Sequence, residues 1–477
     1  MEKQSLTIIG DEEVTVRKSS KFHPSIWGDY FIQNSSLSYA EESTQRMIKK
    51  VEELKVKVMS MFEETSDISQ LMNLIDSIQM LGLDYHFENE IDKALRLIYE
   101  VDDKSYGLYE TSLRFQLLRQ HGYHVSADMF NKFKDDNGSF ISSLNGDAKG
   151  LLSLYNVSYL GTHGETILDE AKSFTKHRLV SLLTELEQSL AAQVSLFLEL
   201  PPCRRIKILL ARKYILIYQE DVMRNNVILE LAKLNFNLLQ SLHQEELKKI
   251  SMWNPQAVYC LPEYLKDYYL KLLMTCEEIE EELEPNEKYR MLYLQDEIKA
   301  LAISYLEEAK WGIERHVPSL DEHLHNSLIS SGCSAVPCVS YVGMGEVATK
   351  EVFDWHSSFP KAVEACCVIG RLLNDIRSHE LEQGRDHTAS TVESYMKDHD
   401  TDAKVACKKL REIVEKAWKD LNKESLNPTK VPRLIIERIV NFSRSMEEIY
   451  KYNDMYTNSD TKMKDNISLV LVESFPV

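Results

Sequence analysis

The chain has 477 residues, of which 43% are hydrophobic and 27% charged, the balance of a soluble globular protein. Its 56 Lys and Arg against 75 Asp and Glu give a formal net charge of −19, which argues against nucleic acid as a partner. No apolar run approaches the roughly 20 residues of a membrane span. The acidic N-terminus does not resemble a leader peptide, so we expect a cytoplasmic protein.

The predicted elements begin after a mixed segment. Residues 1–40 contain a Pro and several Ser, and we expect them to lie as an extended strap over other elements. From about Glu42 onward, apolar residues recur at three- and four-residue spacing, and no alternating strand pattern of useful length appears. The first two apolar stripes are Met47, Val51, Leu54, Val58 and Met61, and then Leu71, Ile75, Ile78 and Leu81. The sequence therefore predicts an all-α protein.

Gly and Pro mark the interruptions of this pattern. Breaks are expected at Asp136-Asn137-Gly138, at Gly161–Gly164 and at Pro201-Pro202. The Pro pair is followed by the basic run CRRIK, and we take it as the domain boundary. Two helical domains are predicted, 1–200 and 201–477.

The second domain continues in the same style. We expect helices over 207–235 and 236–253, amphipathic helices over 405–421 and 434–450, and a polar aromatic loop over 450–456. The acidic run at 276–284 points around most of a helix, which favours a solvated surface helix over a set of metal ligands.

The segment Val363–Glu382 carries the chemistry-bearing side chains. It contains no Pro, and its flanks are apolar, which predicts a helix. One stripe of that helix ends in Arg371, Asn374, Ser378 and Glu382. Oxygen ligands one turn apart suit Mg²⁺, and an Arg one turn away suits an anion bound to it. A solvated polar face is the alternative, and the periodicity does not decide between the two.

The residues Asn374 to Glu382, NDIRSHELE, resemble the second metal motif, (N/D)Dxx(S/T)xxxE, of plant class I terpene synthases. Arg17-Lys18, separated by eight residues from Trp27, resembles a degenerate form of the Arg-Arg-x8-Trp motif of that family. Further segments resemble the sesquiterpene-synthase branch, in order and over nearly the whole chain. They are Phe22–Phe31, Leu74–Ile91, Leu113–Gly138 and Thr162–Ala171.

This resemblance implies an N-terminal α-barrel-like domain and a C-terminal helical bundle that ionises a prenyl diphosphate with Mg²⁺ or Mn²⁺. Farnesyl diphosphate is the implied substrate. By the match, Arg371 and Asn374 bind the substrate, and Asn374, Ser378 and Glu382 bind the metal. Tyr450, Asp454 and Tyr456 match catalytic residues of a loop that closes over the site. An ordinary capped turn is the alternative for that loop.

The family's first metal motif, Asp-Asp-x-x-Asp, is missing. Asp135-Asp136 and Glu220-Asp221 are not followed by an Asp three residues on. Leu238–Trp253 resembles the stretch before that motif, and Asn254–Ala257 resembles the stretch after it. We therefore expect an internal deletion of about two or three helices between residues 253 and 254.

The deletion has a chemical consequence. Each metal ion contributes several kcal/mol, so losing the ligands of two ions lowers the ionisation rate by roughly five or more powers of ten. We expect a monomeric sesquiterpene synthase-like protein that binds Mg²⁺ weakly and is inactive or strongly impaired. A non-catalytic pseudoenzyme, or the product of exon skipping, a damaged gene or an incorrect gene model, is the alternative. A helical interaction scaffold is supported only by the acidic composition.

Overall fold

The computed structural model describes residues 41–101, 105–251, 263–383, 389–427 and 429–476. Within these ranges the secondary structure is helical, apart from an isolated antiparallel bridge between Lys134 and Phe140. The predicted all-α class is therefore confirmed. The strap at residues 1–40 and the join between residues 253 and 254 lie outside the described residues.

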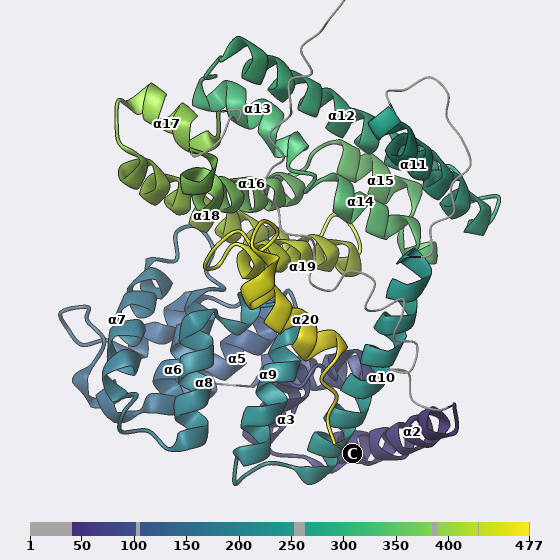
Figure 1. Ribbon diagram of the computed structural model, residues 1–477. Coiled ribbons are helices and arrows are strands. Elements are labelled where there is room, and N and C mark those ends of the chain that lie inside the picture. The colour runs from purple at the N-terminus through teal and green to yellow at the C-terminus, as the bar shows by residue number, and fades with distance from the viewer. Residues whose placement is uncertain (1–40, 102–104, 252–262, 384–388, 428, 477) are drawn as a thin grey trace, which may run out of the picture.

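The N-terminal half is a set of packed helices around one apolar core, in which Leu54, Ile75 and Ile98 are almost fully buried (Figure 1). Local capping fixes where several helices begin: Asp67, for example, accepts a hydrogen bond of 2.8 Å from the amide of Gln70. The helices are α2 (Glu41–Glu64), α3 (Ile68–Met80), α4 (Glu88–Glu100), α5 (Leu108–Gln120), α6 (Ala148–Ser158), α7 (Thr166–Leu182), α8 (Gln188–Glu199), α9 (Lys207–Glu220) and α10 (Asn226–Ser251).

The C-terminal half has a second apolar core, built around α16, which packs against α18 and α19. Figure 1 shows α16 in the middle of the green helices, with α13 and α17 close to it. The helices are α11 (Glu263–Glu282), α12 (Arg290–Glu314), α13 (Leu320–Ser330), α14 (Ala335–Val342), α15 (Lys350–Ser357), α16 (Lys361–Glu382), α17 (Thr391–His399), α18 (Ala403–Glu424), α19 (Arg433–Ile449) and α20 (Lys464–Leu471).

The helix break predicted between residues 235 and 236 is wrong. The chain instead breaks at residues 221–225, between α9 and α10. Asp221 accepts a hydrogen bond of 2.8 Å from the amide of Met223, and the Asn225 side chain accepts one of 2.9 Å from the amide of Val227. These short polar side chains stop one helix and cap the next. The apolar pattern that runs across residue 235 concealed the break.

Helices α9 and α10 contribute side chains to the N-terminal core, so that core extends past Pro201-Pro202. The domain boundary at residue 201 stays a prediction.

The C-terminal tail returns to the N-terminal half. After α19 the chain runs beside α9 and α10, where Figure 1 shows the yellow α20 descending toward the C-terminus. Phe475 is 4% exposed, and its backbone exchanges hydrogen bonds of 2.9 and 3.0 Å with the side chain of Asn237. The tail therefore ties the two halves of the chain together. Across the described ranges, no helix combines the length and the apolar character needed to pass through a bilayer.

Candidate functional site

Helix α16 forms where the sequence predicts it, and its apolar flanks are buried, with Ile369 and Leu372 fully inaccessible. Gly370 is a point of close approach between α16 and its neighbours. A Cβ on Gly370 would lie 2.3 Å from the sulfur of Cys333 and 3.3 Å from Met446 Cγ. The missing side chain thus lets the turn before α14 and one face of α19 reach the backbone of α16.

Arg371 lies on α16 with its side chain 16% exposed. Its guanidinium donates to the Ser327 carbonyl at 3.0 Å, to the Ser330 hydroxyl at 3.0 Å and to Asp375 at 3.1 Å. The Ser330 hydroxyl in turn donates to the carboxylate of Glu308 on α12. The cation therefore joins α12, α13 and α16.

Asp375, the second residue of the metal motif, holds the start of α17. It accepts hydrogen bonds from the Thr391 amide at 2.8 Å and from the Thr391 hydroxyl at 2.5 Å. Burial acts to raise the pKa of Asp375, but Arg371, His323 and the Thr391 donors outweigh burial, so the pKa lies below its ordinary value. The motif match gave Asp375 no role, and no signal in the sequence points to Thr391 as its partner.

The three predicted metal ligands lie along one stripe of α16. Asn374 and Glu382 are partly buried, and Ser378 is 3% exposed. The Ser378 hydroxyl is buried and has no hydrogen-bond partner among the described residues. An orphaned buried hydroxyl costs about 1–3 kcal/mol unless a ligand satisfies it.

Tyr450, Asp454 and Tyr456 lie at the end of α19 and in the loop that follows. Tyr450 is 8% exposed, Tyr456 is 62% exposed, and their ring centroids are 6.2 Å apart. The Asp454 carboxylate accepts hydrogen bonds from the Tyr456 amide at 2.9 Å and from the Thr457 amide at 3.2 Å and hydroxyl at 2.5 Å. The loop therefore contains the capped turn that the sequence left open as an alternative.

Tyr450, at the start of this loop, lies near Arg371 of α16. Burial raises the pKa of Tyr450, and its charged or titratable neighbours are Asp454, Tyr456, Cys333 and Arg371. Burial likewise raises the pKa of Tyr456. Both phenols therefore stay protonated near neutral pH.

Asp375, Ser330 and the neighbouring Arg377 are among the polar residues around α16 that sequence reasoning missed. Arg377 occupies a variable position of the motif, so only its place inside the motif could have drawn attention to it.

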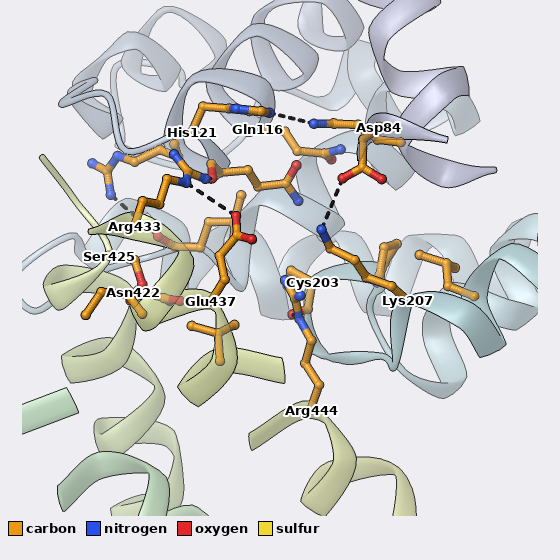
Figure 2. Close-up of a pocket in the computed structure, with 18 of the residues that line it drawn as sticks. Asp84, Gln116, His121, Cys203, Lys207, Asn422, Ser425, Arg433, Glu437 and Arg444 are labelled. Atoms are coloured by element: carbon orange, nitrogen blue, oxygen red, sulfur yellow. Dashed lines mark hydrogen bonds and ion pairs between the residues drawn. The ribbon is translucent and has the colours of Figure 1, made fainter. Parts of the chain in front are cut away.

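A cavity of about 150 Å³ lies elsewhere, between the two halves of the chain, and no residue of α16 lines it. Figure 2 shows His121, Asp84 and Lys207 of the N-terminal half facing Arg433 and Arg444 of α19. Burial lowers the pKa of His121 to about 3, and the His121 ring lies 2.6 Å from the Gln79 amide nitrogen. The cavity contains charged groups of both signs and belongs to the interface between the halves.

Two family models match the chain. The model described as "Terpene synthase, N-terminal domain" matches residues 26–198, and the model described as "Terpene synthase family, metal binding domain" matches residues 243–420. The chain is 76% identical to a beta-eudesmol synthase of Zingiber zerumbet and 72% identical to a (+)-germacrene D synthase of Zingiber officinale. These alignments cover 99% of both chains in the first case and 100% of both in the second.

Solved structures of other proteins share this fold. An isoprene synthase from grey poplar leaves, in complex with three Mg²⁺ ions and dimethylallyl-S-thiolodiphosphate, superimposes with a TM-score of 0.81 at 28% identity, covering 90% of this chain and 97% of that one. A limonene synthase with 2-fluorolinalyl diphosphate gives a TM-score of 0.86 at 25% identity, covering 95% of this chain and 99% of that one. The two-domain helical fold predicted from the sequence is therefore confirmed.

Proposed function

The chain belongs to the terpene synthase family, and from that premise we propose that it is a sesquiterpene synthase-like protein whose ionisation chemistry is strongly impaired. The sesquiterpene assignment is supported by the relatives at 72% and 76% identity. The proposed substrate is a prenyl diphosphate, farnesyl diphosphate by family branch, and the proposed metal is Mg²⁺ or Mn²⁺. A cytoplasmic location and a monomeric state remain predictions.

The residues on α16 fit one divalent cation, held weakly. The orphaned hydroxyl of Ser378 carries this inference, because a metal ion would satisfy it. Asn374 and Glu382 lie on the same stripe and add an amide oxygen and one carboxylate. Within the described residues, no group of three His, Cys, Asp or Glu side chains could hold a metal. A bound divalent ion would supply positive charge to the leaving diphosphate.

Arg371 is the proposed anion-binding side chain. Three of the five N–H groups of its guanidinium are engaged by described residues, which leaves two for diphosphate oxygens. The protonated phenols of Tyr450 and Tyr456 present hydroxyl donors and ring faces near the same helix. In the proposed reaction they shield and stabilise a carbocation.

Two observations support impairment. The sequence contains no Asp-Asp-x-x-Asp. The alignment with the beta-eudesmol synthase runs over 548 positions, so at least 548 − 477 = 71 of them have no residue in this chain. A shortfall of that size supports an internal deletion, which we propose lies between residues 253 and 254. The site then lacks one of its two metal-binding walls.

One face of α12 exposes apolar side chains, which supports the loss of helices that would cover it. Leu292, Ile303, Leu306 and Ile313 are 62%, 68%, 59% and 85% exposed on one helix. Exposed apolar side chains in this density mark a surface that is normally covered.

The decisive experiment is an assay of the purified chain with farnesyl diphosphate and Mg²⁺, beside an intact relative. We expect a rate lower by a factor on the order of 10⁵. Glu382→Gln is the matched control, because it removes the carboxylate of the remaining site and should abolish any residual metal-dependent product. A rate within about a hundredfold of the intact relative would overturn the proposal.

The second candidate, a splice or gene-model product without a catalytic role, is favoured by the same alignment gap. Sequencing transcripts across the codons of Trp253 and Asn254 tests it. An intact transcript carrying the additional helices would assign this chain to a shortened form, and uniform absence of such a transcript would exclude that origin.

A further inference from the structure

Arg377 lies directly before Ser378 on α16, but its guanidinium hydrogen-bonds to the chain at the end of α19. Its Nε donates to the Tyr450 carbonyl at 2.9 Å, and its Nη2 donates to the Lys451 carbonyl at 2.7 Å. Within the described residues, its guanidinium forms no ion pair with a carboxylate. The two carbonyls are therefore its polar partners.

The physical reason lies in the end of α19. Tyr450 is the C-cap residue of that helix, and the last carbonyls of a helix have no intrahelical donor. A cation at a helix C-terminus is favourable, and a charged donor makes a stronger hydrogen bond than a neutral one. Burial and the nearby cation of Arg411 lower the pKa of Arg377, and Cys407 and Glu447 oppose this only in part, so the environment penalises the charge of the guanidinium. The carbonyls offset that penalty.

The loop after α19 is also held from the opposite side. The hydroxyl of Tyr452 donates to the carboxylate of Glu199, the last residue of α8, at 2.6 Å. Asp454 fixes the turn that follows by accepting hydrogen bonds from the amides of Tyr456 and Thr457. The loop is thus suspended between α16 of the C-terminal half and α8 of the N-terminal half.

We propose that Arg377 is a positioning residue that fixes the loop at 450–458 to α16 and so sets where Tyr450 and Tyr456 stand relative to Asn374. The side chain sits in the metal motif but acts on the loop, so a shift of α16 moves the loop with it. The meaning of this coupling for prenyl diphosphate chemistry rests on the proposed function, whereas the coupling itself is a property of the folded chain.

Amide hydrogen exchange of the full chain, without substrate or metal, tests the proposal. Arg377→Met keeps the apolar stem and removes both hydrogen bonds. We expect exchange in peptides spanning 450–458 to rise about tenfold, since a charged hydrogen bond contributes about that factor. Exchange in the buried middle of α16 and in α18 should stay unchanged. Arg377→Lys keeps the positive charge but lacks the planar guanidinium that binds both carbonyls. We therefore expect amide exchange in the same peptides to rise about threefold.

Arg411→Met is the matched control, because it removes the neighbouring cation and leaves the two hydrogen bonds in place. Loop exchange in Arg377→Met within about twofold of the unmodified chain would overturn the proposal, as would an equal rise in Arg411→Met. If Arg377→Met does not fold, Arg377→Lys decides: no rise in loop exchange overturns the proposal. Because no turnover is measured, the absence of a hydrocarbon product counts against the proposed function alone.

Discussion

The guanidinium of Arg204 binds the carboxylate of Glu415 through two hydrogen bonds, of 2.7 and 3.0 Å, across the interface between the N-terminal and C-terminal halves. Lys172 binds the same carboxylate at 2.9 Å. Arg204 also stacks on the rings of Tyr159 and Trp418, 4.9 Å from each. Arg204, shortly after Pro201-Pro202, therefore links the N-terminal half to the C-terminal half.

Glu415→Gln should weaken this contact between the halves and lower the free energy of unfolding. Its pKa lies well below the ordinary value: burial acts to raise it, and Arg204 and Lys172 more than offset that rise. A lowered carboxyl pKa contributes stability above about pH 4.5, and this contribution is lost as the pH falls. The carboxylate is 39% exposed, so screening limits the expected loss at pH 7 to about 1–2 kcal/mol. Urea unfolding at pH 7 measures it, and an unchanged midpoint would contradict it.

Gly370→Ala should strain the site helix. The new methyl group would stand 2.3 Å from the sulfur of Cys333, which is 2% exposed and has little room to turn. We expect a loss of about 1–3 kcal/mol in the free energy of unfolding. The double variant Gly370→Ala with Cys333→Ala should recover most of the loss. A single variant as stable as the unmodified chain would contradict tight packing between α16 and the turn before α14.

Ser378→Ala should test whether the unpaired hydroxyl of Ser378 binds a metal ion. Without metal, the variant should be more stable by about 1 kcal/mol, since a buried unpaired hydroxyl is removed. With excess Mg²⁺, the unmodified chain should gain about 1 kcal/mol that the variant does not gain. Ser394→Ala is the control: its hydroxyl is also buried and unpaired within the described residues, but it lies on α17. Equal Mg²⁺ responses in all three proteins would contradict a site on α16.

His121→Gln should change the response to acid. Burial holds the pKa of His121 near 3, below its ordinary 6.5, so the folded chain resists protonation. Stability is therefore full above pH 6.5 and falls as the pH drops toward 3, by about 2 kcal/mol at pH 5. The Gln variant should lose less between pH 7 and pH 5 in urea unfolding.

Asp76 lines the same cavity, and its effect on stability has the opposite dependence on pH. Burial raises the pKa of Asp76 to about 6, so its contribution is full below pH 3.8 and is lost as the pH rises through 6. Asp76→Asn should therefore be more stable than the unmodified chain at pH 8, by about 1–2 kcal/mol. Equal stability of the two proteins at pH 8 would show that the carboxyl is well solvated.

The sequence by itself determined the helical class, the course of α16 and the stripe that carries Asn374, Ser378 and Glu382. Each of these depends on spacing along one helix, and helical periodicity is a local property of the chain. The missing Asp-Asp-x-x-Asp is likewise a matter of the sequence alone.

Only the tertiary structure decided which side chains meet. Three contacts join helices that are separated along the chain. Arg371 binds α13, Asp375 binds Thr391, and Arg377 binds the carbonyls at the end of α19. A motif gives the position of a residue on its own helix, whereas its partners follow from how helices pack. Burial also depends on the tertiary structure. A buried polar group costs free energy unless it is hydrogen-bonded, and the Ser378 hydroxyl is such a group without a partner among the described residues.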